Sequence, residues 1–535
     1  MLEPAPASNP GAPAPAPRER DTNEVLAARY GAHYRWLATA TVMMGTVAAM
    51  LTTTSINVAL PDIMGAFGIG QDRVQWLSTG ALAAMTIGML VNAWLIQSFG
   101  ERKTFVCALC VFVTALALAG MSPNDTMLIF CRIAQGAVAG MLQPFSMYVI
   151  FRVFPPDRRG TAMGLFGMSV LLGPALGPVL GGVMIDHFNW RYIFYVAMPV
   201  CSAAILCGSV FLPERETDAP RSPFDWPGFV LMAAPLICLL IGLSNGQREG
   251  WTSGFILTLF FCAAAGGMAF LWWESHTPQP LVNLRVFRSL QFTSATAVAC
   301  IFGVGLFGST YLVPLYVQTV QHFTPLNAGL LLMPAGVIMG FAMPIGGWLS
   351  DRIAARQMVI AGLLCFAISS WWLAHVDANM TFWTIAWAVV LSRIGLAIIK
   401  PSLNLAALRA LNPELLSQGA GMVNFSRQLG GAFGVNLLSV TLDRRTFFHS
   451  DTLTATQTAA NSATVEALAR IQTQLAQSGL SPDQLSATAM HYLGRVIHAQ
   501  AYTLGFRDSF LMVALIFTFA LIPAWIMGRH HPQDM

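Results

Sequence analysis

The chain has 535 residues, of which 55% are hydrophobic and only 10% are charged, and its mean hydropathy is +0.60. Soluble proteins carry about 25% charged residues, so this composition excludes a large soluble core and indicates a polytopic membrane protein. The net charge of +4 is ordinary for such a chain and does not suggest nucleic acid as a partner.

The N-terminal residues 1–20 are rich in proline and alanine and then become charged. This composition predicts disorder, and we assign residues 1–34 to a tail. The tail lacks the layout of a cleaved signal peptide, because the first apolar run begins only near Trp36.

Apolar runs of about 20 residues can cross a bilayer as helices, and the sequence contains fourteen of them. They cover residues 36–59, 75–97, 104–121, 126–151, 161–185, 191–212, 227–244, 253–273, 292–318, 327–349, 357–374, 382–408, 420–441 and 509–528. Lys and Arg gather in one alternating set of links, which predicts that both termini are cytoplasmic.

Two links, eight spans apart, have similar sequences. The first contains Gly100-Glu-Arg102-Lys, and the second reads Gly-Trp-Leu-Ser-Asp351-Arg352, with Arg356 following. An aspartate at a helix end beside arginines can bridge neighbouring helix ends, although a solvated turn is the alternative. The repeat indicates an internal duplication, and these residues form a candidate cytoplasmic gate.

Four cations lie inside predicted spans: Arg132, Arg393, Lys400 and Arg427. A charged residue within a span costs at least ~2.5 kcal/mol, so each is a functional candidate. Gln135 lies three residues after Arg132 and shares its helix face. The alternatives are bonding between helices for Arg132 and Arg427, and a cytoplasmic anchor for Lys400.

The span at 161–185 contains the segment LLGPALGPVLGGVMID at 171–186. Its small residues recur every four positions, and its prolines follow one position later: Gly173, Pro174, Gly177, Pro178, Gly181 and Gly182. Residues four apart share a helix face, so a second helix can approach this strip closely.

The long link at 442–508 contains helix-forming runs. Apolar residues recur at 465, 468, 471 and 475, and Ser481-Pro482 fits a helix start with serine as the N-cap. We expect a helical hairpin that either docks on the outer mouth of the protein or meets a partner.

These motifs together resemble the major facilitator superfamily. The resemblance is carried by Arg132 with Gln135 and Gly136, the Gly–Pro helix, the link at Asp351, and the segments Thr53–Pro61 (which includes Asn57), Asn189–Phe194, Pro280–Phe287 and Asn424–Gln428. Fourteen spans are similar to the drug:H⁺ antiporter-2 branch. The long link before the last span is similar to EmrB-type exporters in the inner membrane of Gram-negative bacteria.

The resemblance implies an all-α major facilitator fold with six-helix bundles at 35–212 and 291–530, two inserted helices within 213–290, and a short tail at 531–535. It implies a secondary multidrug exporter that works by alternating access in exchange for protons, without cofactor, metal or catalytic residues. It also implies a periplasmic adaptor (membrane fusion) protein and an outer-membrane channel as partners. The alternatives are a fatty-acid or single-metabolite exporter of the same fold, and a non-transporting membrane sensor.

Within this fold, the Gly–Pro helix is expected to lie against the opposite bundle and to seal the cavity. The acidic residue that the family usually places in the first span is Thr52 here, and the usual aspartate of the first cytoplasmic link is Gln97. No acidic residue falls in the middle of a predicted span.

A cavity with cations and no carboxylates disfavours a cationic drug and favours an amphipathic anion, such as a fatty acid, an aromatic acid or a phenol. The candidate cavity residues are Arg132, Gln135, Arg393, Lys400, Arg427 and Asn57. The candidates for proton coupling are Glu274, Lys400 and Asp62, since burial can shift the pKa of a carboxyl or an amine.

Overall fold

The computed structural model describes residues 21–215, 223–278, 280–375, 377, 380–458, 460–475 and 482–527, and within them it contains helices and no strand. Thirteen helices in these ranges are long and apolar enough to cross a membrane. They coincide with thirteen of the fourteen predicted spans. The remaining span, 420–441, lies in α16 (Leu416–Ala455), which is more polar than the others and packs against α12 and α18.

The first bundle contains α2 (Tyr34–Phe67), α4 (Trp76–Phe99), α5 (Glu101–Gly120), α6 (Asp125–Val153), α7 (Arg159–His187) and α9 (Met198–Phe211). The short helices α3 (Gln71–Val74) and α8 (Tyr192–Val196) lie between them. Helix α6 is central because it packs against α2, α4, α5 and α7. Its buried face is therefore surrounded by protein, which is where polar side chains can be kept away from lipid.

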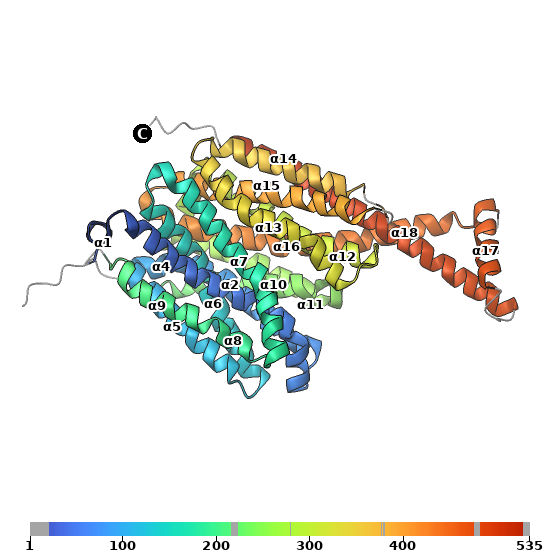
Figure 1. Ribbon diagram of the computed structural model, residues 1–535, viewed down its shortest axis with the longest axis horizontal. Helices are drawn as coiled ribbons and strands as arrows, with labels where there is room; N and C mark the ends of the chain where they lie inside the picture. The colour runs from blue at the N-terminus through green and yellow to red at the C-terminus, as the bar shows by residue number, and fades with distance from the viewer. Residues whose placement is uncertain are drawn as a thin grey trace, which may run out of the picture.

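The second bundle contains α12 (Leu290–Thr319), α13 (Pro325–Ser350), α14 (Ala355–Leu373), α15 (Phe382–Arg409), α16 and α18 (Pro482–Phe519), and α19 (Leu521–Ile526) follows. Between the bundles in sequence come α10 (Trp226–Glu249) and α11 (Gly254–His276), which pack against each other. Helix α10 also contacts α4 of the first bundle and α16 of the second. The predicted architecture of two six-helix bundles with two inserted helices is confirmed (Figure 1).

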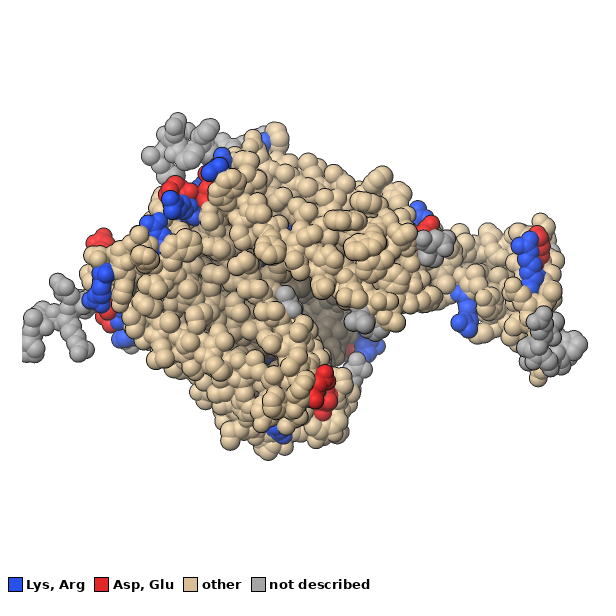
Figure 2. All heavy atoms as spheres, in the orientation of Figure 1, with Lys and Arg blue, Asp and Glu red and all other residues tan. Residues whose placement is uncertain are grey.

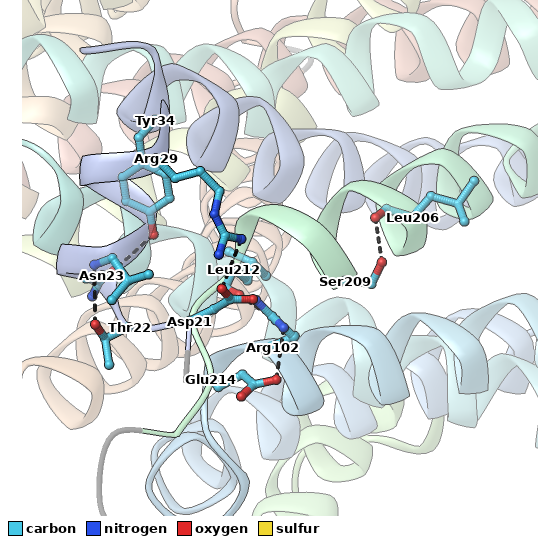
Figure 3. A network of polar contacts seen from close by, with 11 residues as sticks. Asp21, Thr22, Asn23, Arg29, Tyr34, Arg102, Leu206, Ser209, Leu212 and Glu214 are labelled. Carbon is cyan, nitrogen blue, oxygen red and sulfur yellow. Dashed lines mark hydrogen bonds and ion pairs between the residues drawn. The ribbon is translucent and has the colours of Figure 1, made fainter. Parts of the chain in front are cut away.

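The molecule has two ends, which we call the α1 end and the α17 end after the helices found there (Figure 1). Helix α1 (Asn23–Tyr30) falls within the predicted disordered tail, so that prediction is wrong for residues 23–34; residues 1–20 lie outside the described part of the chain. Thr22 caps α1, and Asp21 contacts Arg102 on α5 at 2.9 Å. These contacts fold the segment back onto the first bundle (Figure 3).

At the other end, α16 and α18 continue beyond the bundle and hold α17 (Ser462–Leu475) at their tip (Figure 1). The prediction of a separate link at 442–508 is therefore wrong at both sides, because the two span helices themselves extend through most of it. Helix α18 begins at Pro482 as predicted, whereas Ser481 lies outside the described residues. Helix α17 packs against α18. We call this projection the arm.

Candidate transport site

A carboxylate of the second bundle caps a helix of the first bundle at the α1 end. Asp351, just after α13, accepts hydrogen bonds from the backbone N–H of Gly160 at 2.5 Å and of Thr161 at 2.8 Å, and from the Thr161 hydroxyl at 2.6 Å. These donors belong to the first turn of α7, where the helix dipole favours an anion. Nearby, Arg409 of α15 donates to the carbonyl oxygen of Pro156 at 2.8 Å. Both contacts close the seam between the bundles at this end.

The other candidate gate residues make contacts within their own bundles. The Arg352 guanidinium lies 3.9 Å from the Trp348 ring centroid, and that of Arg356 lies 3.6 Å from the Trp525 ring centroid. The structure therefore brings Asp351 across the seam but not these two arginines.

The matching link of the first bundle binds the N-terminal segment instead. Arg102 donates to the Leu212 carbonyl at 2.7 Å and pairs with Glu214 at 3.0 Å and with Asp21 (Figure 3). Gly100 adopts a φ of 81°, and the backbone of Arg215 passes so close that a Cβ there would clash. This link ties α5 to the segment that follows α9.

The Gly–Pro strip of α7 does not face the opposite bundle, so that expectation is wrong. Thr54 of α2 donates to the Gly173 carbonyl at 3.1 Å, and Ser55 donates to the Gly177 carbonyl at 2.7 Å. Both partners belong to the first bundle. The bare Cα atoms let α2 approach so closely that its hydroxyl groups reach the α7 backbone, which satisfies carbonyls near the helix prolines.

The opposite bundle is met nearer the start of α7. Gly160 and Gly164 lie against Gly347 of α13, where a Cβ at either position would clash with α13 backbone atoms. The predicted small-residue contact with the second bundle thus exists on α7, but two to three turns before the motif itself.

Two of the four embedded cations lie at the interface between the bundles. Arg427 on α16 donates through Nη2 to Gln143 Oε1 on α6 at 2.6 Å. Lys400 on α15 is also buried, and its Nζ lies 5.6 Å from the centroid of the Phe166 ring on α7. Arg427, another cation, lies close enough to act electrostatically on Lys400. In the ranges that the structure describes, neither cation is paired with a carboxylate.

Neutral polar side chains of both bundles also meet at this interface. Gln143 donates to the Met50 sulfur at 3.6 Å, and Asn424 donates to the Met147 sulfur at 3.4 Å across the interface. The Asn424 side-chain oxygen is buried and has no hydrogen-bond partner within the described residues. The interface therefore offers positively charged donors and one free acceptor between flexible thioether side chains.

Sequence reasoning missed Gln143, which no motif singled out. A signal was present, because Gln135, Gln143 and Ser146 recur along one face of α6 at helical spacing. All three are buried, and Ser146 contacts the Thr46 hydroxyl of α2 at 2.7 Å. A line of polar side chains on a span that is otherwise apolar marks the face turned toward protein.

The other two cations are held inside their own bundles. Arg132 donates to Gln135 Oε1 at 2.9 Å and to the Leu77 carbonyl at 3.4 Å, and Gln135 donates to the Ala115 carbonyl at 3.0 Å. Arg393 contacts the Ser309 hydroxyl at 3.1 Å, on α12. These contacts tie neighbouring helices together and agree with the structural alternative for Arg132.

The remaining candidates lie apart from the interface pair. Asn57 and Asp62 are exposed near the α17 end of α2, where Asn57 accepts from the Ser78 hydroxyl at 3.3 Å. Glu274 is buried at the α1 end of α11, beside Asp225. Its Oε1 accepts from the Val282 N–H at 3.4 Å, and its Oε2 has no hydrogen-bond partner within the described residues.

The surface is hollowed between the two bundles, away from the α1 end (Figure 2). The seam is closed by Asp351 and Arg409 at one end and is hollow toward the other. The interface cations lie on α15 and α16, which run between those two regions (Figure 1).

Comparisons with known proteins identify the same fold, and two similar proteins are named for what they do. A sequence model of the Major Facilitator Superfamily matches residues 42–435. Multidrug export protein EmrB of Haemophilus influenzae is 29% identical over 491 residues, which are 91% of this chain and 95% of that protein. Fatty acid resistance protein FarB of Neisseria gonorrhoeae is 30% identical over 493 residues, or 92% of this chain and 96% of that protein.

Two solved structures share the fold at 13% identity. The human organic anion transporter MFSD10 has a TM-score of 0.58 and covers 92% of this chain and 99% of its own. The proton:xylose symporter XylE has a TM-score of 0.59 and covers 93% and 96%. Because one is named for organic anions and the other for a sugar, the fold alone does not select a substrate.

Proposed function

Because the chain belongs to the major facilitator superfamily, a family of membrane transporters, we propose that it exports amphipathic weak acids from the cytoplasm by alternating access. The observation that carries this proposal is the pair Lys400 and Arg427, which are buried at the bundle interface with no carboxylate partner in the part of the chain that the structure describes. The relatives named for multidrug export and for fatty acid resistance support the same reading.

The charge at this site favours an anion for energetic reasons. Removing an ammonium or guanidinium from water costs several kcal/mol unless a counter-charge and hydrogen bonds replace the hydration shell. Within the described residues, Lys400 has no anionic partner to do this, and Arg427 donates to the neutral Gln143. A carboxylate or phenolate of a substrate would supply the missing charge, whereas a cationic drug would add to the repulsion.

We infer that the α1 end faces the cytoplasm of a bacterial cell and that the structure corresponds to an outward-open state. Lys and Arg side chains gather at the α1 end of the surface in Figure 2, as the positive-inside rule requires of a cytoplasmic face. The closed seam at Asp351 and the hollow toward the α17 end support this assignment. Rocking of the two bundles about the interface would then open the other side.

For proton exchange we propose Lys400 first. It lies at the interface that rocking must rearrange, and an amine can release its proton whereas an arginine cannot. Glu274 is the second candidate, because it is buried with one oxygen unsatisfied, but it lies in the inserted hairpin and away from Lys400. Asp62 is the weakest of the three, since it is exposed and water already solvates it.

Transport in proteoliposomes with an imposed pH gradient tests this function. We expect proton-driven export of dodecanoate and little export of dodecyltrimethylammonium, which has the same chain and the opposite charge. Lys400→Gln should abolish anion binding and export. Lys400→Arg should retain binding but lose the dependence on the pH gradient.

A clear preference for the quaternary ammonium compound would overturn the anion proposal. Lys400→Arg with intact proton coupling would reject Lys400 as the proton carrier and leave Glu274 to be tested by Glu274→Gln. Export of neither compound by the wild-type protein, under a gradient that drives a control transporter, would favour a sensor.

We further propose that the arm meets a periplasmic adaptor protein that leads to an outer-membrane channel. Exposed apolar side chains of α18, including Met490, Tyr492 and Val496, lie on this projection beyond the bundle. Replacing these three residues with serine should leave export into the lumen of inverted vesicles intact but reduce co-purification with the adaptor. Undiminished capture of the adaptor would refute this role.

A further inference from the structure

Apart from the hollow between the bundles, a cavity lies under α10, on the α17 side of the middle of the molecule. Its volume is about 340 Å³, within the range of about 300–1,000 Å³ typical of small-molecule sites. The apolar part of its wall comes from both bundles and the inserted hairpin: Leu82 on α4, Leu240 and Leu243 on α10, Phe307 on α12, and Ala432 and Val435 on α16. None of the residues that line it is charged.

Helix α10 covers this cavity by bridging the seam between the bundles. Leu236 and Leu240 are buried in a cluster with Ala83 of α4, against which Leu429 and Ala432 of α16 pack. Near its α17 end, α10 is hydrogen-bonded to both sides.

One of these hydrogen bonds joins α10 to the first bundle, and the other joins α10 to the second bundle. Gln75 of the first bundle donates to the Ser244 hydroxyl at 3.1 Å, and Ser439 of the second donates to Gln247 Oε1 at 2.7 Å. The inserted hairpin is thus a cover over a gap that the two bundles alone would leave open to lipid.

The cavity continues the face of α16 that begins at the interface cations. Gln428, Gly431, Ala432 and Val435 line it, and Gly431 and Val435 lie four and eight residues after Arg427, which is the spacing of one helix face. Val435 lies eight residues beyond Arg427, or about 12 Å along the helix axis. One helix face therefore leads from a positively charged level to an uncharged, largely apolar chamber.

We propose that the cavity under α10 is the subsite for the hydrocarbon tail of a single-chain amphipathic anion, whose carboxylate lies at Arg427 and Lys400. This inference rests on the proposed function and specifies its substrate class as acids with a long, flexible alkyl chain. The head site alone would accept any weak acid. The tail subsite makes affinity depend on chain length, because each buried methylene raises it about fourfold.

The proposal is tested by measuring how tightly the purified protein binds saturated fatty acids that have six to sixteen carbons. Ala432→Phe and Val435→Phe each place a ring in the cavity, and Leu437→Phe places the same ring on the exposed side of α16 as a control. In the wild type and the control, affinity should rise about fourfold per methylene until the cavity is filled. In the two cavity variants the rise should stop several carbons earlier, while benzoate binding stays unchanged.

A photoreactive fatty acid with a diazirine at its terminal carbon provides a second readout. Cross-links should map to 240–244 and 428–436, and the methyl ester of the probe should not give them, since it lacks the charged head. Equal chain-length dependence in all variants, or cross-links confined to exposed surfaces, overturns the subsite. Loss of export with retained chain-length-dependent binding would instead refute the exporter and leave the subsite standing.

Discussion

The contact between Asp351 and the start of α7 gives the sharpest prediction about how the bundles are held together. Its carboxylate accepts three hydrogen bonds from the other bundle, two of them through Oδ2. Hydrogen bonds to a charged group contribute about 1.5–3 kcal/mol each, and the helix dipole adds about 0.3–1 kcal/mol. Asp351→Asn keeps one acceptor oxygen, loses the charge, and turns an amide group toward N–H donors.

Because Asp351 is only partly buried, solvent screens part of this effect. We expect Asp351→Asn to weaken closure at the α1 end by about 2–3 kcal/mol, which is a shift of about 30- to 150-fold in the equilibrium between closed and open seams. Thr161→Val removes only the hydroxyl donor and leaves both backbone donors, so it should shift the same equilibrium by about 1 kcal/mol.

Distances between spin labels at Arg158 and Arg288 measure this equilibrium in a background without native cysteines. Both positions are exposed at the α1 end, one beside each bundle. The wild type should give one short distance, Asp351→Asn should add a longer population, and Thr161→Val should lie between them. A distance distribution in Asp351→Asn that matches the wild type would refute the idea that this carboxylate holds the seam.

Three further predictions concern stability. Gly173→Ala should lower the thermal unfolding temperature, because the new Cβ would lie 2.1 Å from the Met50 Cβ and overpacking costs about 1–3 kcal/mol. The control Gly182→Ala should be neutral or stabilising, because a Cβ there meets nothing within 4 Å. Equal effects of the two substitutions would contradict the close contact between α2 and α7. Arg132→Met should destabilise the apo protein by about 1–3 kcal/mol per orphaned acceptor, whereas Arg427→Met should chiefly remove substrate binding; the reverse pattern would exchange their roles. The Arg102 hydrogen bond lowers the pKa of Asp21 below its usual 3.8, so the stability it contributes is present above that pH and lost as the pH falls through the lowered folded-state value. Pepsin should therefore cut near α1 faster on acidification below pH 3.8 in the wild type, relative to a distant site, but with no such extra acceleration in Asp21→Asn.

The helices were predictable because their lengths and apolar runs are dictated by the bilayer. Their ends were not. Helix α2 continues to Phe67 with Pro61 in its interior, although a proline usually ends a helix in a soluble protein. Membrane helices tolerate such a proline more readily. Helix α16 is polar enough to fall outside a hydropathy criterion, because Asn424, Arg427 and Gln428 are turned inward. Composition reports the average around a helix and not which face meets lipid.

The site was only partly predictable, because sequence shows which residues are unusual but not what they touch. Four embedded cations were equivalent in sequence, yet Arg132 and Arg393 are bonded within their bundles and Lys400 and Arg427 lie between the bundles. The Gly–Pro strip was correctly identified as a close-packing face, but its partner was wrong. A helix with a small-residue strip can pack against a helix of its own bundle or of the opposite bundle. Only the three-dimensional packing shows which of these partners it has.

The two links with similar sequences differ at the position of Asp351, where the first link has Gln97. Asp351 caps α7, whereas its counterpart Gln97 lines a cavity of about 210 Å³ with Glu414 and Gln418 near the start of α16. A neutral amide there has no charge to offer the helix dipole, and Glu414 already supplies an anion beside it. The seam at the α1 end therefore has a carboxylate cap at one of the two similar positions and a cavity lined by polar side chains at the other.

This asymmetry bears on how substrate binding can move the bundles. A ligand shifts a conformational equilibrium only by its difference in affinity for the two states. In this structure Arg427 donates one hydrogen bond to Gln143 of the other bundle. A carboxylate is a stronger acceptor than the amide oxygen of Gln143. A conformation that separates α6 from α16 would leave Arg427 wholly available to an anion, so the anion binds that conformation more tightly. The anion and Gln143 then compete for one guanidinium, so loading the site favours the separation of α6 from α16. The Asp351 contact adds to the free energy that this shift has to exceed.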